Sequence, residues 1–142
     1  MKKSFAFIFL SAVLLFSCKK ETDDTPKITM SGISPSSVTQ GQSVTISIAY
    51  ADGDGDLGED SPNAANLYLI DNRVNVIYKY RIQQLAPSTQ SISIKGNLNI
   101  VVNGLTITDG SASQNVTYSV YVIDRAGHQS NTVTSSAVTI HG

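Results

Sequence analysis

The sequence contains no tryptophan and a single cysteine, Cys18. One cysteine forms no disulfide within the chain and supplies no pair of thiolates for a zinc knuckle. Charge of either sign is scarce, since Lys and Arg number 10, Asp and Glu number 11, and charged residues make up 15% of the chain. The net charge of -1 leaves no basic surface for nucleic acid, so no nucleic-acid partner is predicted.

Apolar residues form a long run only at the N-terminus, where Lys2 and Lys3 precede the apolar residues 5–16. All four phenylalanines lie in this run. A membrane-spanning helix needs ~20 apolar residues, whereas a basic start followed by a shorter apolar segment is typical of a secretory signal peptide. The pattern therefore predicts that residues 1–17 are a signal peptide.

The apolar run ends in Leu15, Phe16, Ser17 and Cys18. This segment resembles the lipobox of bacterial lipoproteins, in which a small residue precedes a cysteine that is acylated and becomes the mature N-terminus. The resemblance implies cleavage before Cys18, a lipid on Cys18 and a membrane as partner, because a cysteine with more than one acyl chain anchors stably. The alternative is a plain secretory peptide with an incidental cysteine.

Residues 19–24, Lys-Lys-Glu-Thr-Asp-Asp, follow the cysteine. They resemble the lysine-then-acidic export signal of lipoproteins from Bacteroidetes-type bacteria, which implies an outer-membrane protein displayed at the cell surface. The alternative is a polar tether on a protein that faces the periplasm. Because the segment is polar and ends at Pro26, residues 18–26 are predicted to be the lipidated cysteine and a flexible tether.

Residues 27–142 alternate apolar and polar positions with period two, and clusters of Gly, Pro, Ser, Asn and Asp separate the segments, a pattern that predicts β-strands. The expected strands cover residues 28–33, 44–50, 67–70, 74–82, 92–94, 98–102, 116–122 and 133–140, with tight turns at Asp71-Asn72 and Gly96-Asn97. No segment has a capped 3.6-residue period, so no helix is expected. Seven or eight short strands predict an all-β fold, a single antiparallel sandwich.

Two segments of this domain carry a more specific resemblance. Residues 118–131, Tyr-Ser-Val-Tyr-Val-Ile-Asp-Arg-Ala-Gly-His-Gln-Ser-Asn, resemble strand F and the F–G turn of immunoglobulin-like and fibronectin-type-III-like domains. Residues 33–44 resemble the A–B segment of bacterial Ig-like repeats. The resemblance implies an Ig-like β-sandwich in which Tyr118 forms a corner hydrogen bond to upstream backbone.

Five of the eleven acidic residues fall in residues 52–60, Asp-Gly-Asp-Gly-Asp-Leu-Gly-Glu-Asp. Like charges at this density repel each other, and oxygen ligands at alternate positions with glycines between them suit Ca²⁺. Leu57 stands where an EF-hand loop requires glycine, so the segment is not an EF-hand. The segment Asp-Gly-Asp-Gly-Asp-Leu-Gly at residues 52–58 resembles a motif of Ig-like surface proteins of Bacteroidetes. The acidic segment therefore predicts a calcium site.

Topology adds a ligand from a distant segment. In an Ig-like sandwich the B–C and F–G loops lie at one end, together with the start of strand A. The predicted ligands of a structural Ca²⁺ are therefore Asp52, Asp54, Asp56, Asp60 and Asp124. Two alternatives stay open, an acidic loop that is only solvated and a calcium ion that captures a ligand.

Motifs of catalysis are missing. His128 and His141 have no second histidine at zinc-binding spacing, and there is no nucleophile elbow, P-loop or dinucleotide-binding glycine motif. His128 is expected in an exposed turn. The sequence therefore predicts a protein that is not an enzyme.

Tyrosine is the only aromatic residue type after the signal peptide. Exposed strand tyrosines, here Tyr68, Tyr78, Tyr80 and Tyr121, stack sugar rings in many carbohydrate-binding modules, whereas half-buried strand tyrosines are the ordinary alternative. The preferred interpretation is a non-catalytic, lipid-anchored cell-envelope module for protein binding or adhesion. The alternative is a carbohydrate-binding accessory lipoprotein of a glycan-uptake system.

Overall fold

The computed structural model describes residues 23–142, which form ten β-strands and no helix. The strands are β1 (Lys27–Ser34), β2 (Ser37–Thr39), β3 (Val44–Asp52), β4 (Leu67–Asp71), β5 (Val76–Tyr80), β6 (Ile94–Val102), β7 (Ser113–Val116), β8 (Tyr118–Val122), β9 (Val133–Thr134) and β10 (Val138–His141). Within this part of the chain, no helix is long and apolar enough to cross a membrane. The expected all-β fold is confirmed, whereas residues 1–17 and Cys18 lie outside the described residues.

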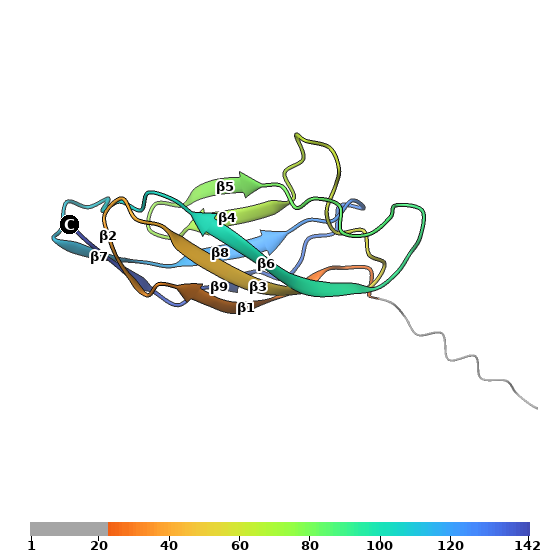
Figure 1. Ribbon diagram of the computed structural model, residues 1–142, viewed down its shortest axis with the longest axis horizontal. Helices are drawn as coiled ribbons and strands as arrows, with labels where there is room; N and C mark the ends of the chain where they lie inside the picture. The colour runs from red at the N-terminus through yellow and green to blue at the C-terminus, as the bar shows by residue number, and fades with distance from the viewer. Residues whose placement is uncertain (1–22) are drawn as a thin grey trace, which may run out of the picture.

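Two sheets pack face to face as a sandwich (Figure 1). One sheet has the strand order β1-β3-β6, and the other has the order β5-β4-β8-β9. A third sheet, β2-β10-β7, lies at the end of the domain that holds the C-terminus (Figure 1). The strand pairs are antiparallel except for β2 with β10, which is parallel.

Six of the ten strands form three longer, interrupted strands, which we call strand lines. β7 and β8 are separated only by Thr117, and β9 and β10 only by residues 135–137. At this break the Tyr118 N–H donates to Ser135 Oγ at 3.0 Å, and the Ser135 N–H donates to the Tyr118 carbonyl at 2.8 Å. Joining β1 with β2, β7 with β8 and β9 with β10 leaves seven lines, which agrees with the expected seven to eight strands.

The core lies between the facing sheets and is built from alternate residues of the central strands. Ile46 and Ile48 of β3 and Leu69 of β4 are fully buried, as is Val120 of β8. Their neighbours in each strand point to the opposite face of the sheet, because successive side chains alternate. Among residues 23–142 the buried cluster runs from Ile28 to Ile140, so this part of the chain contains a continuous core and is expected to fold on its own.

The predicted turn at Gly96 and Asn97 is wrong. β6 runs unbroken through both residues and pairs with β3 along its whole length. Gly96 lies opposite Tyr50, and the Tyr50 ring occupies the space that a side chain at position 96 would need. A glycine that makes room for a cross-strand ring has the same local signature as a glycine in a turn, which is why the pattern misled.

The expected corner hydrogen bond of Tyr118 is not formed either. Tyr118 is 1% exposed, and among residues 23–142 its hydroxyl makes no hydrogen bond to upstream backbone. Burial, together with the nearby carboxylate of Asp71, raises the pKa of Tyr118 to about 12. Asp71 itself, predicted as a turn residue, is buried at the end of β4, where its carboxylate pairs with Arg73 Nη2 at 2.6 Å and Nε at 3.0 Å.

Candidate metal centre

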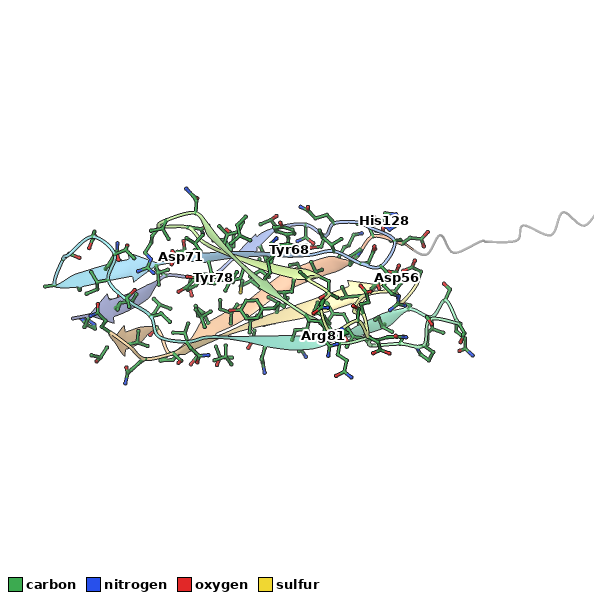
Figure 2. All side chains as sticks on the ribbon, turned by 90° about the horizontal axis from the view of Figure 1, so that it is seen from above. Asp56, Tyr68, Asp71, Tyr78, Arg81 and His128 are labelled. Carbon is green, nitrogen blue, oxygen red and sulfur yellow. The ribbon has the colours of Figure 1, made fainter. Side chains whose placement is uncertain are left out.

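The acidic segment begins at the last residue of β3 and continues into the loop that leads to β4. Asp52 is in phase with the buried residues Ile46 and Ile48, so the strand carries its side chain inward. Figure 2 shows Asp56 at the same end of the domain as His128, the end where the described chain begins. We call this end the base of the sandwich.

Three carboxylates converge at the base. Asp52, Asp54 and Asp56 each place a carboxylate oxygen within 4.8 Å of the others. The Oδ1 atom of each is buried and has no hydrogen-bond partner among residues 23–142. The second oxygens of two of them are occupied, because Asp52 Oδ2 accepts the Leu57 N–H at 2.8 Å and Asp56 Oδ2 accepts the Ala126 N–H at 3.0 Å.

The surroundings disfavour negative charge on two members of this triad, Asp52 and Asp56. Burial, with the nearby charges of Asp54 and Asp56, raises the pKa of Asp52 to about 6. Burial also raises the pKa of Asp56, with further contributions from Asp124 and Asp54. Unpaired buried carboxylates cost free energy unless a proton or a cation neutralises them. The triad therefore has the oxygen donors and the uncompensated charge that a divalent cation requires.

The glycines of the segment serve close packing between backbones. A Cβ on Gly53 would collide with the Asp23 carbonyl, one on Gly55 with the Ile92 carbonyl and one on Gly58 with the Gln83 carbonyl. Gly55 and Gly58 also have left-handed φ angles of 76° and 88°. These glycines let three distant segments approach the acidic loop, a role that the sequence pattern alone does not distinguish from folding around an ion.

Asp124 approaches the triad as the topology predicted. The Arg125 N–H donates to the Asp56 carbonyl at 3.3 Å, so the 123–132 loop touches the acidic segment. The predicted ligand role of Asp124 does not follow, however, because its oxygens already face His128. Asp124 Oδ1 accepts the His128 N–H at 2.7 Å, and Oδ2 lies 3.1 Å from His128 Nδ1. The Asp124 carboxylate raises the pKa of His128.

Asp60 lies outside the group of converging carboxylates. Its side chain is exposed, and its carbonyl accepts a hydrogen bond from Arg81 Nη1 at 2.9 Å. The chain turns away after Gly58, whose carbonyl is bonded to Arg125 Nη1 at 2.6 Å. Spacing along the sequence suggested Asp60 as a ligand, but this turn places it on another surface.

Part of the predicted tether is attached to the base. The Asp23 carbonyl accepts the Gly53 N–H at 3.2 Å, and the Asp24 carbonyl lies 3.2 Å from His128 Nδ1. Asp23 also pairs with Lys27, and Pro26 is buried. Residues 23–26 are therefore part of the folded domain, which differs from the expected flexible linker over residues 18–26.

A cavity of about 360 Å³ lies beside the triad. Asp54 and Asp56 form one part of its wall, and Arg125 and the exposed residues 88–91, Ser-Thr-Gln-Ser, form the rest. A hydrogen bond of 3.1 Å from the Ile92 N–H to the Asp54 carbonyl holds this second loop against the acidic segment. Residues 88–91 carry no sequence signal of a binding site, because a polar cluster after a proline is the ordinary signal of a loop.

The strand tyrosines are arranged differently from an open sugar platform. Tyr68 and Tyr121 stack on each other with centroids 4.8 Å apart and an interplanar angle of 3°, and Lys79 Nζ lies 6.0 Å from the Tyr68 centroid. Tyr78 and Tyr80 pair with the buried residues of β4, so they lie on the core side of the sheet. The rings therefore cover one another or lie on the inward face at the edge of the sheet.

The histidines lie apart from any complete catalytic constellation among residues 23–142. Ser37 Oγ lies 3.0 Å from His141 Nε2 on the exposed surface of β2 and β10, but no carboxylate orients the His141 ring there. His128 is oriented by Asp124, but no hydroxyl bonds to its ring within the described residues. The nucleophile, base and orienting acid of a hydrolase triad are therefore not assembled at either histidine among the described residues.

Comparisons of the chain with protein-family models, with curated proteins and with solved structures found no match.

The metal-free protein is expected to become more stable on acidification. The pKa of Asp52 is about 6 in the folded state, above its ordinary value of 3.8, so the folded state binds more protons. This contribution to stability is complete below about pH 4 and is lost as the pH rises through about 6, which predicts a gain on the order of 2 kcal/mol between about pH 7 and pH 4.5. Urea unfolding in decalcified buffer measures it.

The variant Asp52→Asn is the control for this pH dependence. An amide does not titrate, so most of the gain between the two pH values should disappear. A wild-type protein that loses stability steadily on acidification over this range would contradict the raised pKa of Asp52.

Proposed function

We propose that this chain is a non-catalytic binding module of the bacterial cell envelope, anchored through a lipid on Cys18 and stabilised by calcium at the base of its sandwich. The single observation that carries the proposal is the convergence of three buried, unpartnered oxygens from Asp52, Asp54 and Asp56. Oxygen donors without nitrogen or sulfur suit a hard cation. Calcium tolerates the flexible, irregular coordination that a loop offers better than magnesium does.

The contacts at the base favour a structural role for the ion. Three segments meet there: residues 23–24 where the described chain begins, the acidic loop after β3, and the 123–132 loop. A cation that neutralises the acidic loop stabilises the contacts which the loop makes with both neighbours. This arrangement keeps the domain rigid at the end that joins the proposed tether.

The resemblance to Ig-like domains of Bacteroidetes-type lipoproteins supports the same proposal. A three-stranded sheet faces a four-stranded sheet, and the loop after β3 meets the loop after β8 at one end. In Ig-like sandwiches the B–C and F–G loops likewise lie at one end, which supports the proposal. Such domains commonly serve as binding modules, although a fold by itself does not specify a ligand.

We expect the substitution Cys18→Ser to release the protein from the membrane. Wild-type protein should incorporate a palmitate analogue and sediment with outer membranes, because two or more acyl chains give stable anchoring. The variant should lose both the label and the membrane association. Metabolic labelling with cell fractionation measures this.

The double variant Lys19→Gln, Lys20→Gln is the matched control, since it keeps the cysteine and changes only the proposed export signal. It should retain the label, and added protease should digest it on intact cells less readily than the wild type. Label that persists in Cys18→Ser would contradict lipidation, and equal protease sensitivity would favour the periplasm-facing alternative.

The proposed role in protein binding or adhesion has support from the edge strand β5. Val74, Val76 and Ile77 on and before this strand are 43–50% exposed, and exposed apolar side chains at a sheet edge are typical of contact sites. A photocrosslinker at Ile77 should capture a surface protein on intact cells, while one at the exposed Asn97 of β6 should not. Equal labelling from both positions would argue against a contact through β5.

Carbohydrate binding is a second candidate function, and the cavity beside the triad is the observation that favours it. The stacked tyrosines give it little support, because Tyr68 is covered by Tyr121 on one face and approached by Lys79. The cavity, in contrast, has free polar groups next to a candidate cation.

A further inference from the structure

The candidate metal centre has incomplete coordination. Three Oδ1 atoms converge, and the second oxygens of Asp52 and Asp56 are already hydrogen-bonded to backbone N–H groups. Calcium takes about six to eight oxygen ligands. With three carboxylate oxygens from the triad, several positions remain for other oxygens, which water or a ligand supplies.

These open positions face a defined space. Asp52 is 2% exposed and does not line the cavity of about 360 Å³, whereas Asp54 and Asp56 do. That volume is at the lower end of the ~300–1,000 Å³ range of small-molecule sites. An ion held by the triad therefore presents its unfilled side to a space that accommodates a sugar unit.

The other lining residues of the cavity supply hydrogen-bonding groups. The side chains of residues 88–91 are two serine hydroxyls, a threonine hydroxyl and a glutamine amide, and none bonds to another described residue. Such groups donate and accept, as sugar hydroxyls do. The wall is thus complementary to a polyhydroxyl ligand.

The charge balance of the site favours a neutral ligand. Three carboxylates, the Arg125 guanidinium and a calcium ion sum to zero, and the Asp124 carboxylate nearby is paired with His128. A carboxylate or phosphate ligand would add negative charge next to the triad. Uncharged hydroxyl oxygens can complete the coordination sphere without that repulsion.

We propose that calcium held by Asp52, Asp54 and Asp56 binds two adjacent hydroxyl groups of a neutral sugar, which residues 88–91 position in the cavity. This inference rests on the proposed calcium site and assigns a ligand class to it. It gives the ion two roles, since the same cation that stabilises the base also coordinates the ligand.

The test is isothermal titration of residues 19–142 with methyl mannoside, methyl galactoside and methyl glucoside, in calcium and in chelator. At least one glycoside should bind in calcium with a Kd on the order of 1 mM, and binding should be lost in chelator. The fully O-methylated form of that glycoside, which has no free hydroxyls, should not bind. Binding that persists in chelator would overturn the inference.

Variants separate the sugar site from the calcium site. Gln90→Ala should weaken sugar binding about fivefold, the loss expected for one hydrogen bond, while the calcium-induced shift in thermal unfolding stays intact. Ser136→Ala, an exposed serine outside the cavity, should change neither. If calcium stabilises the protein and none of the three glycosides binds, the inference fails and the proposed function stands. If calcium has no effect on unfolding and no glycoside binds, both fail.

Discussion

The midpoint of thermal unfolding of residues 19–142 should rise by about 10 °C when saturating calcium replaces a chelator. A ligand at 100 times its Kd adds about 2.7 kcal/mol to the free energy of unfolding, and each kcal/mol shifts the midpoint by about 4 °C for a domain of this size. The structural reason is the triad, whose buried Oδ1 atoms have no partner among the described residues. Circular dichroism or scanning calorimetry measures the shift.

Two variants of the same loop give opposite results in this experiment. Asp52→Asn should abolish the shift, because it removes the most buried ligand. Asp60→Asn should leave the shift unchanged, because Asp60 is exposed and lies outside the converging group. Loss of the shift in Asp60→Asn would favour the ligand set expected from sequence spacing over the one in the structure.

The same Asp52→Asn variant should raise stability in the chelator. Burial and neighbouring charges disfavour the ionised carboxylate at this position, and an amide removes that charge while its N–H groups donate to Asp54 or Asp56. The variant should therefore be more stable than the wild type in chelator and less stable than the wild type in calcium. A variant that is more stable than the wild type without calcium and less stable with calcium is the result expected of an ion site. A wild-type midpoint that is identical in calcium and chelator would refute the metal centre.

The substitution Gly55→Ala should lower the free energy of unfolding by about 3 kcal/mol, through left-handed backbone strain and a steric collision. Gly55 has a φ of 76°, and its added Cβ would meet the Ile92 carbonyl. That collision is between backbones, so no side-chain rotation relieves it. The acidic loop and the 83–93 segment must separate, which also moves Asp54 and Asp56.

Gly104→Ala separates the two causes of destabilisation, backbone strain and steric collision. Gly104 has a similar φ of 66°, but nothing lies within 4 Å of the position that an added Cβ would take, so only the backbone strain of about 1 kcal/mol applies. Urea unfolding of the two variants in calcium measures the difference. Equal destabilisation would mean that close packing against Ile92 contributes nothing, and that the loop has room that the structure does not show.

The strand pattern could be predicted from the sequence because alternation is a local property. Ile46 and Ile48 are buried and their neighbours are not, since successive side chains of a strand point to opposite faces. The break at Thr117 could not be predicted, because it depends on the hydrogen bonds between Tyr118 and Ser135, which lie 17 residues apart in sequence. Gly96 was misassigned for the same kind of reason, as its partner is Tyr50 on another strand.

In the candidate site, too, some features follow from local sequence and others from contacts between distant residues. The density of charge in residues 52–60 and the alternate spacing of Asp52, Asp54 and Asp56 pointed to these three residues. Their convergence within 4.8 Å still depends on the fold of the loop, because residues four apart lie ~13 Å from each other in an extended chain. Asp60 and Asp124 required knowledge of the path of the chain. Asp60 turns away after Gly58, and Asp124 arrives at the base but pairs with His128.

Local pattern was thus sufficient for the all-β class and the inward strand faces, because both depend on residues that are neighbours in the chain. The tertiary structure decided which carboxylates converge, what the glycines make room for, and that residues 88–91 face Asp54 and Asp56 across a cavity. These features join segments that are far apart in the sequence. Such pairings are set by the packing of two sheets around one core, and no short window of sequence contains that information.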